Sequence, residues 1–585
     1  MRLLDWLILL PFCGLLLTQT VLSQRATSAT YDETAHLPAG YVYLQYGNYS
    51  LNAEHPPLIK MLAALPLPFI AVKMPPEDVL FGGPWFAGSS ADFTFGHRLL
   101  YVENDADRLL FWGRLAVLPL TLLLAGIVFL WTKHLFGRTA AFLAVFLYTF
   151  EPNLLAHAPL VNTDLGVACF IFLTMYGCYR AAQQLSIPSL LFAGFAGGLA
   201  LATKFSALML LPMLLLVGGS VVVSAHPIAL RFKGGRLVHV TSQPRKLLIL
   251  LAAMLGTGAV AYVTVWATYR FRFAGIPLGE LSYAAPWEQI LVDRPWIKEA
   301  FLWMKDVRAL PEAYLYGFAT VLESVKRPTF LLGEISTEGR WYYFLVTFVL
   351  KTPLPLLLLL LMTPLALRSL WRKDPVAMLC LVVPIVVYLG IASASRLNIG
   401  HRHLLPIYPF LFVMAGSLVP WLRRQRVLVM GSVGVLAVWY VVSSVSIFPH
   451  YLAYFNELAG GPDRGYKYLV DSNLHWGQDL KGLKRFMDTQ GIERVWLAYF
   501  GSASPEYYGI TYDYLPGNVT WTPQNIRDDV FRFDVLPPLR GVIAISATNL
   551  QGVYYPPGKT DYLAWYRQQT PIAKIGYSIF IYRVE

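Results

Sequence analysis

Residues 247–267 read LLILLAAMLGTGAVAYVTVWA, a run of twenty-one residues without a charged side chain. The hydrocarbon core of a bilayer requires about 20 apolar residues in a helix. Ten further stretches approach this pattern, so the sequence predicts eleven membrane-spanning helices. Together they cover residues 4–22, 112–131, 139–156, 164–180, 188–203, 205–224, 247–267, 342–366, 375–394, 404–421 and 427–447.

The composition agrees with a membrane protein. Of the 585 residues, 56% are hydrophobic and only 14% are charged, whereas soluble domains carry about 25% charged residues. This composition argues against a soluble enzyme and against a disordered chain. The 4 cysteines all lie in apolar runs, so neither a structural disulfide nor a cysteine-bound metal is expected.

The basic residues are distributed asymmetrically along the chain. A net charge of +12 would suggest nucleic-acid binding in a soluble protein. If the N-terminus is cytoplasmic, however, the loops on that side carry fifteen basic residues and only two acids, Asp5 and Asp374. The rest of the chain carries thirty-two basic and thirty-three acidic residues. This is the pattern of cytoplasmic membrane loops, so we expect no nucleic-acid partner.

With this orientation, three long segments lie outside the membrane. They are two loops, at about 23–111 and 268–341, and the C-terminal region. We therefore expect a transmembrane domain over residues 1–447 and an exoplasmic domain over residues 448–585. The first span could alternatively be a signal peptide that is cleaved after Ser23, and the loop after it would still face outward.

The C-terminal region has the pattern of an α/β domain. Three stretches resemble strands, RVWLAYFG, GVIAISATNL and IGYSIFIYRV, and DLKGLKRFMDTQ has the pattern of an amphipathic helix. Before that helix, Asp471, Asn473 and Gln478 could bind an acceptor substrate. Alternatively, this stretch could simply cap the helix that begins near Asp479.

Charged side chains beside membrane spans are costly and are therefore candidates for function. Here they cluster near the outer ends of the predicted spans. The candidates are the acids Asp32, Glu33, Glu54 and Asp164, and the basic residues His55, Lys204, Arg396, Arg402 and His403. Structural alternatives exist, because loop acids often cap helices and basic side chains at span ends can extend to the interface.

These groups suit transfer of a sugar from a lipid phosphate. The leaving phosphate is already charged, so the reaction needs no general acid. It needs cations that hold the departing phosphate, which Lys204, Arg396, Arg402 and His403 could supply. It also needs one carboxylate that removes the proton of the acceptor hydroxyl.

On these motifs the chain resembles the polytopic, lipid-phosphate-dependent glycosyltransferases of the C-type fold. This family includes protein O-mannosyltransferases and the aminoarabinose transferase of lipid A. The stretches that carry the resemblance are Asp32-Glu33, Glu54-His55-Pro56-Pro57, the turn from His157 to Asp164, Gly198 to Pro212, and Gly400 to Pro409.

The resemblance implies roles for individual residues. Asp32 would be the catalytic base of an inverting displacement, with Glu33 beside it. Glu54, His55 and Lys204 would lie at the carrier phosphate, although some relatives have Lys where this chain has His55. Asp164 would match the second acidic motif. The metal requirement differs between branches of the family, so a divalent metal stays open and no other cofactor is implied.

The resemblance also implies partners and a location. The donor would be a polyprenyl-phosphate-linked sugar, and the acceptor a protein, lipid or glycan. The enzyme would lie among the lipids of a bacterial-type inner (plasma) membrane. The alternative is a lipid-linked sugar flippase or a secondary transporter, which would be expected to carry ionisable groups at span centres.

Overall fold

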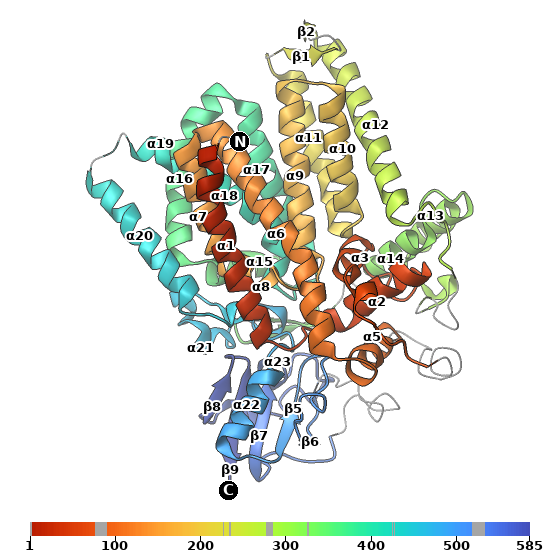
Figure 1. Cartoon of the computed structure of the whole chain (residues 1–585), viewed down its shortest axis with the longest axis vertical. Coiled ribbons are helices and arrows are strands. Elements are labelled where there is room, and N and C mark those ends of the chain that lie inside the picture. The colour runs from red at the N-terminus through yellow and green to blue at the C-terminus, as the bar shows by residue number, and fades with distance from the viewer. Residues whose placement is uncertain are drawn as a thin grey trace.

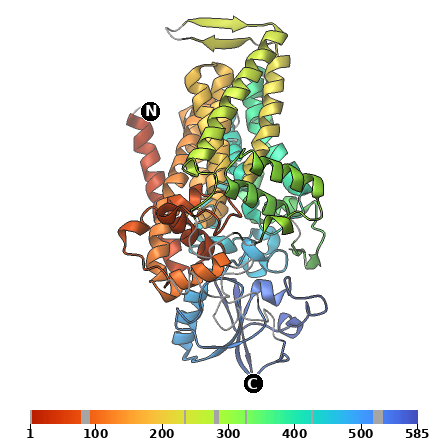
Figure 2. The same ribbon diagram turned by 90° about the vertical axis from the view of Figure 1, so that its right-hand side faces the viewer.

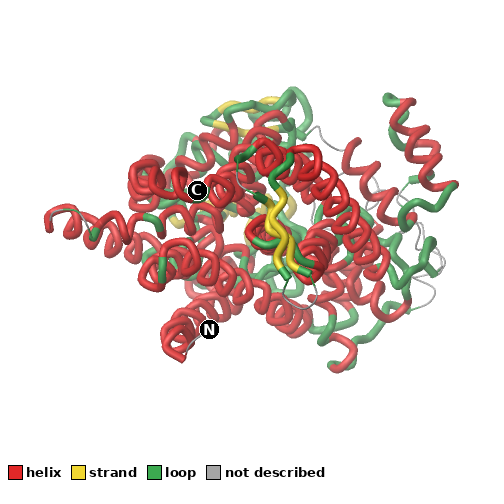
Figure 3. Tube along the Cα trace, turned by 90° about the horizontal axis from the view of Figure 1, so that it is seen from above, coloured by secondary structure: helices red, strands yellow, loops and turns green. Residues whose placement is uncertain are grey.

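The computed structural model describes residues 3–76, 91–225, 227–232, 236–276, 283, 285–323, 327–423, 425, 427–517 and 533–585. A bundle of long helices forms the larger part, and a mixed sheet lies at one end of it (Figures 1 and 2). The chain's N-terminus and the hairpin β1–β2 (Ile228–Arg231 and Leu237–Val240) lie toward the other end. In the view from above, this hairpin crosses over the helix ends (Figure 3).

Eight described helices are long and apolar enough to cross a membrane. The chain is therefore an integral membrane protein. Six of them are the single helices α1 (Leu3–Ala26), α6 (Ala106–Phe136), α9 (Asp164–Gln183), α12 (Gln243–Thr268), α16 (Leu354–Lys373) and α17 (Pro375–Ala394). The other two are composite: η4 (Phe205–Met209) with α11 (Leu210–Val223), and η6 (His401–Ile407) with α18 (Tyr408–Gly416) and α19 (Leu418–Leu422).

Three of the eleven predicted spans are shorter helices in the structure. They are α7 (Arg138–Thr149), α10 (Ile187–Leu201) and α20 (Val427–Val445). The segment after α7 turns because Glu151 caps a new short helix, α8 (Pro152–His157), with its side chain on the Asn153 amide. Eight of the eleven predicted spans thus correspond to described helices that are long and apolar enough to cross a membrane, and the exact number of spans stays a prediction.

The predicted span over 342–366 is also divided. It consists of α15 (Tyr343–Lys351) and the start of α16, with a break at Thr352 and Pro353. Proline has no amide hydrogen and disfavours the helical conformation in the residue before it. Thr352 is accordingly extended, with φ −87° and ψ 133°.

The two outer loops of the prediction contain helices that lie beside the bundle, toward its sheet end (Figure 1). In the first are α2 (Glu33–Tyr46), α3 (Leu58–Ala64), η1 (Leu67–Phe69), α5 (Ala91–His97) and the π-helix η3 (Arg98–Val102). In the second are η5 (Trp287–Gln289), α13 (Pro295–Asp306), α14 (Glu312–Glu323), and the hairpin β3–β4 (Thr329–Leu331 and Glu334–Ser336).

The C-terminal sheet has the strand order β6-β5-β7-β9-β8. Strand β5 (Val495–Ala498) runs parallel to β6 (Tyr512–Tyr514) and β7 (Gly541–Ser546), whereas β9 (Ile579–Val584) is antiparallel to β7 and β8 (Ala573–Ile575). Helix α22 (Leu480–Gln490) buries Leu480, Leu483 and Met487. The α/β prediction is confirmed, except that the ATNL end of the second predicted strand forms the short helix α23 (Ala547–Leu550).

Residues between α20 and the sheet pack against the bundle. They form η7 (Tyr451–Ala453), η8 (Glu457–Ala459), α21 (Pro462–Gly465) and η9 (Asp471–Asn473), and the short helix α24 (Ala564–Arg567) follows β7 later in the chain. The Ser23 hydroxyl donates to the Pro449 carbonyl at 2.7 Å, which ties this segment to the end of α1. The predicted domain boundary at residue 447 stays a prediction.

Candidate active site

Four of the predicted site residues meet in one ionic network at the sheet end of the bundle. The Arg402 guanidinium Nη1 lies 3.0 Å from Asp32 Oδ2 and 3.2 Å from Asp164 Oδ2. The Lys204 ammonium lies 2.5 Å from Asp164 Oδ1. Two carboxylates and two permanent cations therefore alternate within hydrogen-bonding distance. We call these four residues the ionic network.

Breaks between helices position each member of the ionic network. Asp32 directly precedes α2 without capping it through its side chain, and Asp164 is the first residue of α9. Lys204 lies in the extended link between α10 and η4, and Arg402 lies in the first turn of η6. Because a helix break leaves backbone groups unpaired, such positions attract polar side chains, and here four of them converge.

Access to solvent differs sharply between the two acids of the network. The Asp32 side chain is 21% exposed, whereas that of Asp164 is 2% exposed. Asp164 is held between Lys204 and Arg402, whereas Asp32 has only its contact with Arg402 in the network. Asp32 is thus the more solvent-accessible of the two network carboxylates.

Glu33 is placed differently from Asp32. Its two oxygens accept hydrogen bonds from Arg114 at 2.8 and 2.5 Å, from the Thr30 amide at 2.8 Å and from the Val161 amide at 3.0 Å. Burial opposes ionisation, but Arg114 and these hydrogen bonds hold the pKa of Glu33 below its usual value. The fully buried carboxylate joins α2, α6 and the turn before α9.

The segment around Glu54 and His55 lies next to the network. Glu54 is exposed. The Lys60 ammonium, fully buried, donates to the His55 carbonyl at 2.8 Å and to both oxygens of Asn52, at 2.6 and 2.5 Å. Burial lowers the pKa of Lys60 to about 7. Lys60, which is not among the predicted site residues, therefore fixes the turn that carries His55.

His55 and His403 share a feature that some other histidines of the described chain also have, such as His401 and His475. His55 Nδ1 and His403 Nε2 are both buried and have no hydrogen-bond partner among the described residues. His55 interacts electrostatically with Lys204 and Asp164. His403 interacts with the same two residues and with Arg402. Both rings therefore border the ionic network.

Trp476 is a site residue that was not predicted. The Arg402 guanidinium carbon lies 4.2 Å from the centre of the Trp476 ring, a cation–π contact. The Trp476 carbonyl accepts from the Tyr31 amide at 2.7 Å, directly before Asp32. Trp476 thus joins both members of the Asp32–Arg402 pair. The sequence feature that could have identified it is its position within the polar stretch SNLHWGQD.

The three predicted acceptor-binding residues have different environments. The Asn473 side chain is fully engaged, accepting from the His401 amide at 2.8 Å and donating to the Tyr343 hydroxyl at 2.9 Å. Gln478 bonds within its own turn, to the Trp476 amide at 2.7 Å. Both side chains are thus engaged within the protein, but neither contact caps α22, whose start at Asp479 has no side-chain cap. The acceptor-binding role of these residues stays a prediction.

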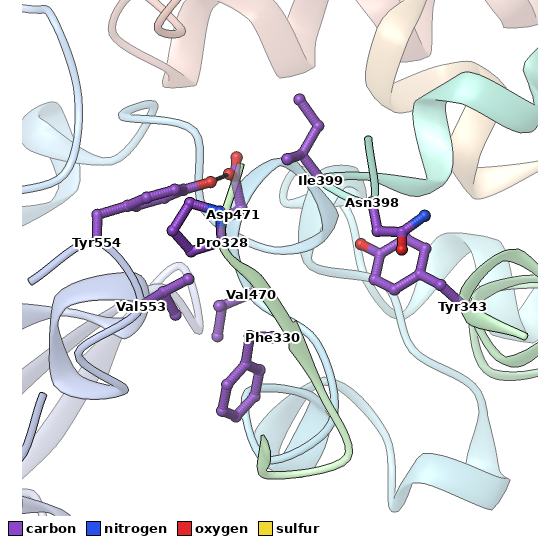
Figure 4. Close-up of a pocket in the computed structure, with 9 residues that line it drawn as sticks. All are labelled: Pro328, Phe330, Tyr343, Asn398, Ile399, Val470, Asp471, Val553 and Tyr554. Carbon is purple, nitrogen blue, oxygen red and sulfur yellow. Dashed lines mark hydrogen bonds between the residues drawn. The ribbon is translucent and has the colours of Figure 1, made fainter. Parts of the chain in front are cut away.

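Asp471 instead lines a small pocket between the bundle and the sheet (Figure 4). Its carboxylate accepts from the Tyr554 hydroxyl, and the neighbouring walls come from Tyr343, Asn398 and Phe330. Burial raises the pKa of Asp471. Since Asp471 also interacts electrostatically with Arg402, the pocket adjoins the ionic network.

Arg396 lies apart from the other predicted cations. Its guanidinium pairs with Glu338 at 2.7 Å, and the two side chains are 52% and 71% exposed. Within the described residues, no group of three or more His, Cys, Asp or Glu side chains is arranged to hold a metal ion. The permanent cations at the network itself are therefore Lys204 and Arg402.

Comparisons with known proteins give a family match and several structural likenesses. Residues 108–234 match the family model described as dolichyl-phosphate-mannose-protein mannosyltransferase. No curated protein matches the chain in sequence.

Among solved structures, ArnT from Cupriavidus metallidurans in the apo state is 14% identical, with a TM-score of 0.49, over 98% of this chain and 97% of that chain. The same protein bound to undecaprenyl phosphate is 13% identical, with a TM-score of 0.47, over 99% and 98%. The oligosaccharyltransferase AglB from Archaeoglobus fulgidus, in complex with an inhibitory peptide and a dolichol-phosphate, is 12% identical, with a TM-score of 0.39, over 74% and 56%.

The segment that matches the family model contains Arg114, which pairs with Glu33, and both Asp164 and Lys204 of the ionic network. The match therefore confirms, for this part of the chain, the expected resemblance to the lipid-phosphate-dependent glycosyltransferases.

Proposed function

We propose that this chain is an integral membrane glycosyltransferase that moves a sugar from a polyprenyl-phosphate donor to an acceptor hydroxyl by inverting displacement. The observation that carries the proposal is the ionic network, in which a partly exposed carboxylate lies beside two permanent cations. The family match supports the donor class, because its description names a dolichyl-phosphate sugar.

Asp32 is the catalytic base in this proposal. Its exposed oxygen takes the proton of the acceptor hydroxyl, and the acceptor oxygen attacks the anomeric carbon of the sugar. The bond from that carbon to the phosphate oxygen breaks, and the phosphate leaves with the electron pair. Lys204 and Arg402 stabilise the leaving phosphate, for which Asp164 holds them in position.

The other predicted residues take supporting roles. Glu33 positions Asp32 through the buried pair with Arg114. His55 and His403 face the phosphate with their unpartnered nitrogens, and Glu54 lies at the rim. The Asp471 pocket is proposed as part of the acceptor site.

The reaction takes place at the exoplasmic face of a bacterial-type plasma membrane in this proposal. The distribution of basic residues supports this orientation. Asp5 at the start of α1 pairs with Lys133 at 2.5 Å and with Arg138 at 2.9 Å, so two of the basic residues assigned to the cytoplasmic side lie beside the N-terminus. That end is opposite the sheet and the C-terminus (Figure 1).

The test begins with mass spectrometry of lipids that co-purify with the protein, which should reveal a polyprenyl-phosphate sugar. Purified protein in liposomes with this lipid and an extract of acceptor should release polyprenyl phosphate in step with glycosylated product of inverted configuration. The Lys204→Met variant should release far less. Movement of the lipid across the bilayer with its glycosyl–phosphate bond intact would instead establish a flippase and overturn the proposal.

A further inference from the structure

Two buried imidazole nitrogens at the proposed phosphate site, His55 Nδ1 and His403 Nε2, have no partner among the described residues. Most buried polar atoms in proteins are hydrogen-bonded, and an exception requires an explanation. Two other nearby histidines are paired: His36 Nδ1 lies 3.0 Å from the Val161 carbonyl, and His157 Nδ1 lies 3.3 Å from the Asn162 amide nitrogen. Other histidines of the described chain, such as His401 and His475, also have an unpartnered buried nitrogen, but of this set His55 and His403 are the two that interact electrostatically with both Lys204 and Asp164.

The charged groups around His55 come from four elements. Lys204 precedes η4, Lys60 lies in α3, Asp164 begins α9, and His36 of α2 has its ring centre 6.0 Å from that of His55. Burial and the Lys204 ammonium hold the pKa of His55 well below its ordinary value. His55 is therefore neutral at pH 7 before an anion arrives.

The surroundings of His403 overlap with those of His55. Its ring interacts electrostatically with Lys204, Arg402, Asp164 and His157. The centre of the Phe344 ring lies 6.3 Å from that of His403. Because Lys204 and Asp164 interact with both His55 and His403, the two imidazoles approach the network from the α2–α3 loop and from η6.

The charge of the ionic network itself balances. Lys204 and Arg402 contribute two positive charges, and Asp32 and Asp164 contribute two negative charges. A bound donor is a phosphate diester with one negative charge, and the leaving carrier is a monoester with a second one. Once Asp32 has released the acceptor proton to solvent, the network has no surplus positive charge for the two negative charges of the bound carrier.

We propose that His55 and His403 take up a proton when the carrier phosphate monoester occupies the site, so that binding of the carrier is coupled to protonation. This inference rests on the proposed function. The transfer step stays balanced: the acceptor hydroxyl releases one proton to Asp32, and the phosphate leaves with the electron pair. The proton on the imidazole nitrogen is a separate one, taken up from solvent and returned when the carrier leaves. The protonated imidazole donates a hydrogen bond to a phosphate oxygen.

The sign of the pH dependence follows from linkage. An anion beside an imidazole favours its charged form and raises its pKa. A ligand that raises a pKa binds more tightly as the pH falls. We therefore expect the affinity for the carrier to decrease as the pH rises above neutrality, by up to about tenfold per pH unit for one coupled proton.

The experiment measures proton uptake by titration calorimetry of the full-length protein with farnesyl phosphate. Comparison of the binding enthalpies in two buffers of different ionisation enthalpy at pH 7.5 gives the number of protons taken up on binding. The second pKa of a phosphate monoester is about 6, so the ligand is already a dianion. We expect an uptake of about one proton and weaker binding at pH 8.5 than at pH 7.5.

The variants assign this uptake to residues. In His55→Gln with His403→Gln, the amides can still donate hydrogen bonds but cannot titrate, so uptake should disappear while binding persists. Each single variant should reduce the proton uptake. Its thermal unfolding midpoint is checked to be unchanged. The matched control is His239→Gln, since His239 lies exposed on β2 at the other end of the bundle, and it should retain the full uptake.

The outcomes separate this inference from the proposed function. Binding without proton uptake, or uptake that persists in the double variant, would overturn the coupling and leave the transferase proposal intact. A wild-type protein that binds no farnesyl phosphate would overturn both. Glycerol 3-phosphate, a monoester without the isoprenoid chain, should bind far more weakly; equal binding would show a site for free monoesters and contradict a carrier site.

Discussion

Glu33 and Asp32 are neighbours in sequence, but their environments give them different chemistry. Glu33 has no exposed surface and pairs with Arg114, whereas Asp32 keeps part of its carboxylate in contact with solvent. A buried carboxylate with several donors stabilises structure at the expense of reactivity. The sequence suggests the two acids as one functional unit. In the structure Glu33 supports the fold, and Asp32 is the candidate for the chemistry.

Replacing Glu33 by Gln should therefore destabilise the protein. The change leaves the Arg114 guanidinium buried without its counter-charge, for which a loss of about 3–5 kcal/mol is typical. The thermal unfolding midpoint measures this effect. The double variant Glu33→Gln with Arg114→Met should recover part of the loss, and a Glu33→Gln protein as stable as the wild type would contradict the structural role.

Lys60 gives a pH-dependent prediction. Its pKa is about 7 in the folded protein, well below the roughly 10.4 of an unfolded lysine. Between these values the unfolded chain binds more protons, so the free energy of unfolding contributed by Lys60 rises with pH. The slope of stability against pH between 7.5 and 9.5 should be smaller in Lys60→Met than in the wild type. Identical slopes would refute the assignment.

At the scale of elements, close contacts between helices position the turn that carries His55. A Cβ atom on Gly40 of α2 would lie 2.0 Å from the Lys60 carbonyl oxygen of α3, so only glycine allows these backbones to meet. Through Lys60, this contact fixes the turn that carries His55. The arrangement of α2 on α3 is thus part of the site, although Gly40 touches no reacting group.

Gly40→Ala should separate α2 from α3. Overpacking of this kind costs about 1–3 kcal/mol, so the thermal midpoint should fall and binding of farnesyl phosphate should weaken. Gly126→Ala in α6 is the matched control, since a Cβ there has no atom within 4 Å. Equal behaviour of the two variants would show that the α2–α3 contact does not position the site.

The helices, the strands and their polar ends could be predicted from the sequence better than the contacts between side chains. Asp32, Asp164, Lys204 and Arg402 could be selected because charges at span ends are unusual. Their pairing could not be predicted, since Asp32 and Arg402 are 370 positions apart. Trp476 and Arg114 were missed because aromatic residues are common at membrane interfaces and a buried arginine has no local pattern. The break at Pro353 was readable from the proline but lay within a continuous apolar run.

At the scale of the whole molecule, the C-terminal region completes the site. The Ser472 hydroxyl donates to the Ile399 carbonyl at 2.9 Å, and Asn473 holds the His401 amide. A Cβ on Gly400 would lie 2.1 Å from Ser472 Oγ, so this approach is close. The bundle and the region before the sheet therefore share one interface, on which the position of Arg402 depends.

The proposed orientation makes Lys559 exoplasmic and His239 cytoplasmic. Both are exposed, so a cysteine introduced at either position can be labelled. In intact spheroplasts, a membrane-impermeant maleimide should label Lys559→Cys but should label His239→Cys only after permeabilisation. The reverse pattern would invert the topology and place the ionic network on the cytoplasmic side.

The rate of sugar transfer by Asp32→Asn, compared with that of the wild type, tests most directly whether Asp32 removes the acceptor proton. Loss of a general base lowers kcat by about 100- to 10,000-fold. The variant should show this loss in liposomes while its thermal midpoint and farnesyl phosphate binding stay near those of the wild type. The control Asp561→Asn, at an exposed carboxylate between α23 and α24, should be fully active. An Asp32→Asn protein that transfers sugar at the wild-type rate would contradict the account.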